Sequence, residues 1–157
     1  MKTTTDNKIL REHLLDLLLG ESAHVNFEAA VKDMPAALRG KRAKGGAHSP
    51  WEVLEHLRIT QWDILEFIRN PKHVSPEFPA GYWPATPDGD WDASAEAFRV
   101  GLKEIAAMVA DPSADVLAVI PHCDGKTLLR EVLLLADHNS YHLGQLIEIR
   151  RALGAWG

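Results

Sequence analysis

The chain has 157 residues, of which 46% are hydrophobic and 25% are charged, and these values are typical of one globular domain rather than of a disordered segment. The formal net charge of −5 argues against a nucleic-acid-binding surface, because phosphate contacts require a concentrated basic face. A single cysteine, Cys123, excludes an intramolecular disulfide and is typical of a reducing compartment.

The first part of the chain predicts one long and one short helix. Residues 6–19 carry aliphatic side chains at helical spacing, with Asp6 as a candidate N-cap. Gly20 stands where a left-handed residue would end this helix. A shorter helix is predicted over residues 26–31, and the glycine-rich, charged stretch 39–50 is interpreted as a solvated loop rather than a nucleic-acid patch.

The clearest start signal belongs to a helix predicted over residues 49–70. Ser49 is placed as N-cap, Pro50 follows at the first helical position, and Glu52 completes a capping box. The next segment, residues 71–90, contains five prolines, too many for a helix or an inner strand. A connection this long is uncommon inside a compact domain unless it crosses a bundle or covers a site, so we expect a crossover.

The C-terminal part of the chain predicts two more long helices. One begins near Asp90 or Asp92 and stops before Pro112, and the other is capped by Thr127 and runs to about Leu153. Between them the run VLAVI indicates a short extended piece. The expected fold class is therefore all-α, a four-helix bundle with a long crossover between its second and third helices, forming one domain over residues 1–157.

The location expected from the sequence is the cytoplasm. The polar N-terminal stretch, MKTTTDNKIL, lacks the apolar core of a signal peptide. No later apolar run approaches the roughly 20 residues needed to span a bilayer, so no membrane association is expected.

Two histidines stand four residues apart on the last predicted helix. On a helical wheel His142 lies at the centre of the leucine stripe and His138 lies about 40° to one side. Their rings are one turn apart on the inward face, where they can converge on one ion. They can equally be core histidines satisfied by other partners, because leaving a buried polar group unpaired costs about 1–3 kcal/mol.

A third candidate ligand is His56, on the helix predicted over residues 49–70. It shares its helical sector with Glu52 and Asp63, at the edge of the core-facing surface. These two carboxylates are either groups that orient a ring or move a proton, or exposed side chains. The other histidines, at positions 13, 24, 48, 73 and 122, are interpreted as surface or loop residues.

The crossover carries aromatic residues, and the chain has one thiol. Tyr82, Trp83 and Trp91 either form a lid over the histidine site or anchor the loop to the bundle. Cys123 lacks a paired base at a recognisable spacing, which argues against a catalytic thiol. No catalytic residue and no organic cofactor is assigned.

The segments SPWEVLEHL, residues 49–57, and DHNSYHLGQL, residues 137–146, resemble the DinB-like, or YfiT-like, superfamily of small four-helix metal-binding proteins. The resemblance implies a divalent metal ion held by His56, His138 and His142, with zinc expected first and nickel second. It also implies a homodimer, and an activity that uses low-molecular-weight thiols.

The expected function is a divalent-metal-dependent enzyme with an open three-histidine site. Three neutral imidazoles leave one coordination position in which a water or a thiol becomes acidic, whereas structural zinc sites normally have four protein ligands. The expected classes are a thiol-dependent transferase, an isomerase or a hydrolase acting on a small molecule. The alternative is a non-catalytic metal- or ligand-binding bundle.

Overall fold

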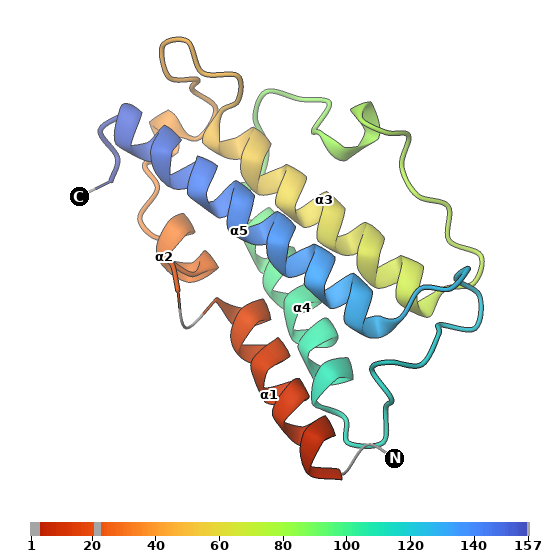
Figure 1. Ribbon diagram of the computed structural model, residues 1–157. Helices are drawn as coiled ribbons and strands as arrows, with labels where there is room; N and C mark the ends of the chain where they lie inside the picture. Colours follow the sequence, from red (N-terminus) through yellow and green to blue (C-terminus); the bar gives the residue numbers. More distant parts are fainter. Residues whose placement is uncertain (1–3, 21–22, 157) are drawn as a thin grey trace.

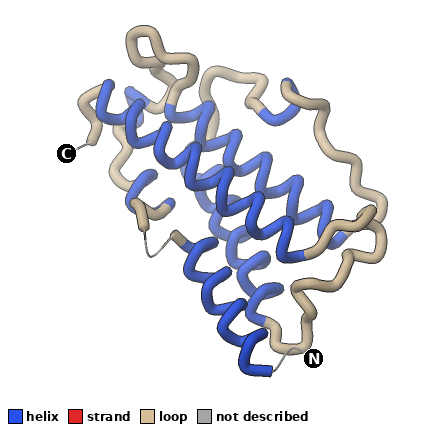
Figure 2. Tube along the Cα trace, viewed as in Figure 1, coloured by secondary structure: helices blue, strands red, loops and turns tan. Residues whose placement is uncertain are grey.

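The computed structural model describes residues 4–20 and 23–156, and these residues form an all-helical bundle (Figure 1). The helices are α1 (Thr4–Leu19), α2 (Phe27–Val31), α3 (Pro50–Arg69), α4 (Trp91–Ala110) and α5 (Leu128–Ala152). The four long helices pack together, since α1 and α3 each contact both α4 and α5. No strand occurs in the described ranges (Figure 2), so the predicted fold class is confirmed.

Local capping signals set the starts of the long helices that carry the site. The Ser49 hydroxyl accepts the Glu52 backbone N–H at 3.2 Å, and the Glu52 carboxylate accepts the Ser49 N–H at 2.7 Å. Thr127 caps α5 in the predicted way, through its hydroxyl and the Arg130 N–H. The prediction of Asp6 as N-cap is wrong, because α1 already begins at Thr4.

Replacing Ser49 with alanine is expected to lower the free energy of unfolding by about 0.5–2 kcal/mol, because the first turn of α3 loses its side-chain acceptor. Urea denaturation followed by circular dichroism measures this difference. Ser113→Ala, at an exposed hydroxyl in the loop after α4, is a suitable control and should change stability much less. Equal stabilities of wild type and Ser49→Ala would contradict the assigned cap.

The apolar core has two clusters, one at each end of the bundle. Near α2, the first cluster includes Leu57 of α3 and Leu143 of α5. The second includes Ile64 of α3 and Leu135 of α5. On α5 the residues between Leu135 and Leu143 therefore lie between two packed clusters, and close packing on both sides restricts how the side chains there can move.

Residues 70–90 form the predicted crossover, which leaves the end of α3 and returns along the bundle to the start of α4 (Figure 1). Because of this return, α3 and α4 run in the same direction, which a short loop could not achieve. A 3₁₀ turn, η2 (Ala80–Tyr82), contacts α3 on the way. The predicted extended piece before α5 is reduced to an isolated bridge between Val119 and Thr127.

Within residues 4–20 and 23–156, no helix is both long enough and apolar enough to cross a bilayer.

Candidate metal centre

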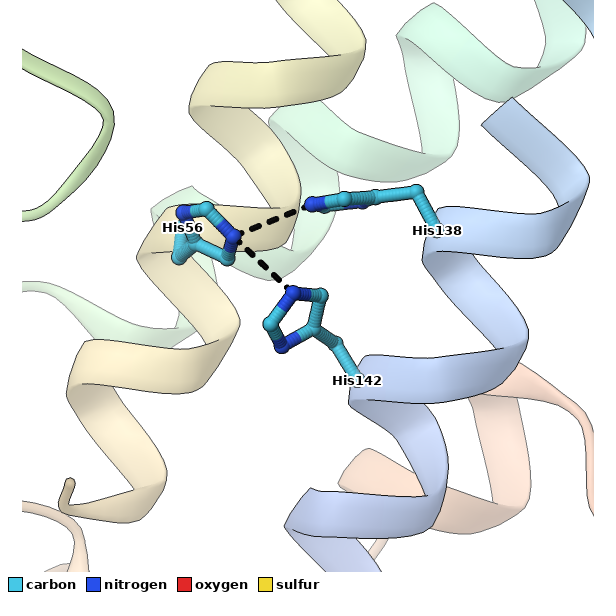
Figure 3. Close-up of side chains that lie close together, drawn as sticks. All are labelled: His56, His138 and His142. Carbon is cyan, nitrogen blue, oxygen red and sulfur yellow. Dashed lines mark hydrogen bonds between the residues drawn. The ribbon is translucent and has the colours of Figure 1, made fainter. Parts of the chain in front are cut away.

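Three histidine side chains from two helices meet between α3 and α5 (Figure 3). The Nε2 atom of His56, on α3, lies 3.0 Å from Nε2 of His138 and 3.1 Å from Nε2 of His142, both on α5. One ligand atom from each residue lies within 4.8 Å of the others. The structure therefore brings together all three residues that the sequence proposed as metal ligands.

Burial keeps these three rings neutral. His56 and His142 are each only 8% exposed, and His138 is partly buried. Desolvation, together with the neighbouring rings, lowers the pKa of His138 to about 3 and the pKa of His142 to about 4. Desolvation also lowers the pKa of His56. At neutral pH the rings are therefore in the form that coordinates a metal ion.

Hydrogen bonds made by Nδ1 determine which ring nitrogen carries the proton in His56 and in His142. The Nδ1 atom of His56 is 2.8 Å from the Tyr82 carbonyl oxygen, so it must donate. The Nδ1 atom of His142 is 2.8 Å from Oε1 of Gln145 and donates in the same way. A neutral imidazole has one N–H, so the two Nε2 atoms face each other as lone pairs with no proton between them.

This arrangement fits a cation. Two nitrogens bound tetrahedrally to zinc at about 2.0–2.1 Å lie about 3.3 Å apart, a few tenths of an ångström more than the observed separations of 3.0 and 3.1 Å. An ion between the rings would replace the contact between lone pairs with coordination bonds. Imidazole nitrogens suit zinc and nickel alike, so the donor set leaves the choice of metal open.

Comparison with models of known protein families matches residues 20–146 to the DinB superfamily. The chain belongs to the DinB superfamily. The match includes α2 to α4, most of α5 and all three clustered histidines, and it confirms the resemblance drawn from the two histidine-containing segments. Searches of curated proteins and of solved structures found no match.

An indole from the crossover covers one face of the cluster in this DinB-superfamily protein. The Trp83 ring stacks on His56 at 4.0 Å and on His48 at 3.8 Å, in both cases with planes 6° apart. Two parallel imidazoles this close cannot share one face, so Trp83 is sandwiched between them. His48 is thus half-buried rather than simply solvated, while Trp91 lies in the core and takes no part in a lid.

Glu52 and Asp63, the α3 carboxylates that share a helical sector with His56, have separate environments, and neither forms a hydrogen bond or ion pair with a clustered histidine. Glu52 belongs to the capping box and pairs with Arg42. Asp63 is buried, contrary to the exposed alternative, and accepts hydrogen bonds at 2.7 Å from both the Tyr82 hydroxyl and His73 Nε2. The His73 side chain is only 7% exposed, so its interpretation as a solvated loop residue is wrong.

His122 and Cys123 lie away from the cluster, as predicted. Both contact the carbonyl oxygen of Phe67, near the far end of α3, at 2.9 and 3.5 Å respectively. Burial raises the pKa of the Cys123 thiol, the opposite of what a reactive thiol requires.

Two groups that orient the histidines were not assigned from the sequence. Gln145 stands three residues after His142, a helical spacing that brings side chains together, so its role could have been predicted. The contact of His56 with the Tyr82 carbonyl depends on how the crossover docks, and residue spacing contains no signal for it.

Proposed function

We propose that this DinB-superfamily protein is a divalent-metal-dependent enzyme that acts on a small molecule. Its ion is held by His56, His138 and His142, with zinc as the first candidate and nickel as the second. The observation that carries the proposal is the convergence of three Nε2 atoms, two of which have their protons held on the opposite side of the ring by Tyr82 and Gln145.

Residues around the three histidines favour metal binding in two ways. Burial keeps the rings deprotonated at the inward nitrogens, and the stacked indole of Trp83 shields one face of His56 from water. When bound, a zinc-type ion with three histidine ligands supplies an open coordination position that lowers the pKa of a water or a thiol toward neutrality. Three protein ligands suit this role better than a purely structural one, for which four are usual.

We further propose that the reaction uses a low-molecular-weight thiol, as a transferase, an isomerase or a hydrolase. The chain's only cysteine, Cys123, is buried and hydrogen-bonded to Phe67 rather than placed beside the histidines. A reacting thiol would therefore come from outside the chain. The non-catalytic metal- or ligand-binding bundle is the competing function.

The test is a substrate screen on protein loaded with zinc or with nickel, after elemental analysis has shown one ion per chain. Small thiols are offered with electrophiles, isomerisable unsaturated compounds and esters. We expect thiol-dependent turnover that is lost in His138→Ala. Full occupancy without turnover of any substrate class would favour the non-catalytic bundle, and wild-type protein that takes up neither metal would refute the proposal.

Self-association as a homodimer stays a prediction from the family resemblance. Sedimentation velocity of the metal-loaded and the metal-free protein measures it directly. A single species with the mass of one chain, 17.4 kDa, across micromolar concentrations would contradict it.

A further inference from the structure

Three polar side chains fasten the proline-rich crossover to α3, and we call Asp63, His73 and Tyr82 the clasp. Both oxygens of the Asp63 carboxylate are used, one by the Tyr82 hydroxyl and one by His73 Nε2, each at 2.7 Å. Asp63 and His73 are almost wholly removed from solvent. Hydrogen bonds to a buried carboxylate are stronger than those between neutral groups, so the clasp holds the crossover at a defined place.

Tyr82 links the clasp to the metal centre. Its hydroxyl bonds to Asp63, and its backbone carbonyl accepts the Nδ1 proton of His56 at 2.8 Å. Asp63 follows His56 by seven residues, about two turns along the same face of α3. Tyr82 is therefore bonded to two residues of α3, Asp63 and His56, and the His56 ring belongs to the histidine cluster.

The hydrogen bond to the Tyr82 carbonyl fixes the tautomer and the orientation of the His56 ring. With the proton held at Nδ1, the lone pair stays on Nε2 and points toward His138 and His142. If the crossover shifted, the ring would lose this partner, and both its tautomer and its rotation would be less restricted. Outer partners of metal-bound histidines typically contribute about 10–100-fold to metal affinity.

We propose that Asp63, His73 and Tyr82 are positioning residues of the metal centre, because they fix the crossover so that the Tyr82 carbonyl holds the His56 ring. This inference rests on the proposed metal binding by the three histidines. Coupling between sites is reciprocal, so an ion in the centre also strengthens the docking of the crossover. The Tyr82 hydroxyl is protonated at neutral pH and donates to Asp63, and burial raises its pKa further, to about 12.

The experiment compares zinc affinity, measured by competition with a chelator, in wild type, Tyr82→Phe and Asp63→Asn. We expect both variants to bind zinc more weakly, by up to the about 10–100-fold that loss of a direct outer partner typically costs. The matched control is Thr86→Val, which removes a 2.7 Å hydrogen bond to Asp88 in the same crossover, away from His56. Its zinc affinity should equal that of wild type.

Two further readouts separate positioning from general destabilisation. The visible absorption of bound cobalt(II), which reports ligand geometry, should change in Tyr82→Phe and not in Thr86→Val. Zinc should slow hydrogen exchange of residues 72–83 in wild type, and should slow it less in Tyr82→Phe. If circular dichroism shows that Tyr82→Phe does not fold, the same measurements are made on Asp63→Asn, which alters the same hydrogen bond from the acceptor side.

The outcomes distinguish this inference from the proposed function. Tight zinc binding by wild type, loss in His138→Ala and unchanged affinity in both clasp variants would overturn the clasp alone. Absence of both zinc and nickel binding by wild type would overturn the proposed function, and the clasp's role with it. Equal weakening in Tyr82→Phe and Thr86→Val would also overturn the inference, because it would show that any disturbance of the crossover has the same effect.

Discussion

Replacing His56, His138 or His142 with alanine is expected to weaken zinc binding by more than about 100-fold, since losing a ligand should cost more than losing an outer partner. The three inward nitrogens form one site, so removing any of them leaves only two imidazoles. Competition titration and elemental analysis after gel filtration measure the loss.

The control substitutions are His122→Ala and Cys123→Ala, which change metal-binding residue types outside the cluster. Both residues contact the Phe67 carbonyl rather than the clustered rings, so zinc affinity should stay close to that of wild type. Losses of equal size in the two sets of variants would show that the ion binds elsewhere. Circular dichroism of every variant ensures that only folded proteins are compared.

The metal-free protein is expected to lose stability as the pH falls below about 6.5, the ordinary pKa of histidine. In the unfolded chain the histidines take up protons near that pH, whereas the fold lowers the pKa of His142 to about 4 and that of His138 to about 3. Between these limits the unfolded state binds more protons than the folded state. Each such histidine then lowers the free energy of unfolding by up to about 1.4 kcal/mol per pH unit of acidification.

Urea denaturation of metal-free protein at pH 7, 6 and 5 measures this slope. The matched variant is His138→Leu, which replaces one of the partly or fully buried titrating rings with an apolar side chain of similar size. Its stability should fall less steeply between pH 6.5 and 4 than that of wild type. Identical slopes would mean that His138 is protonated as readily in the fold as in the unfolded chain, contrary to its burial.

The lowered pKa values also set the pH range in which protons compete with the metal ion. With unperturbed histidines, metal affinity should fall as the solution is acidified through pH 6.5. In the folded protein, protons compete with the ion at His142 and His138 only near pH 4 and below. Loss of metal between pH 6 and 4 would therefore reflect either protonation of His56, whose pKa is also lowered, or unfolding of the chain, and circular dichroism recorded on the same samples distinguishes the two.

The helices and the three candidate ligands could be predicted from the sequence because their signals are local. A serine, a proline and a glutamate within four residues are enough to start α3, and the structure contains that capping box. The positions of His138 and His142 relative to the leucine stripe follow from helical periodicity alone. His56 was identified in the same way, from its sector on α3.

Only the tertiary structure decided how these residues interact. The contacts of His73 with Asp63, of Trp83 with His48, and of the Tyr82 carbonyl with His56 all depend on where the crossover docks, and helical periodicity does not extend into a proline-rich loop. The protonation of the cluster likewise depends on burial and on the approach of rings from two helices. Tautomers and pKa values depend on burial and on contacts between different helices. Residue spacing within a single helix therefore identified the ligands but could not predict their tautomers or their lowered pKa values.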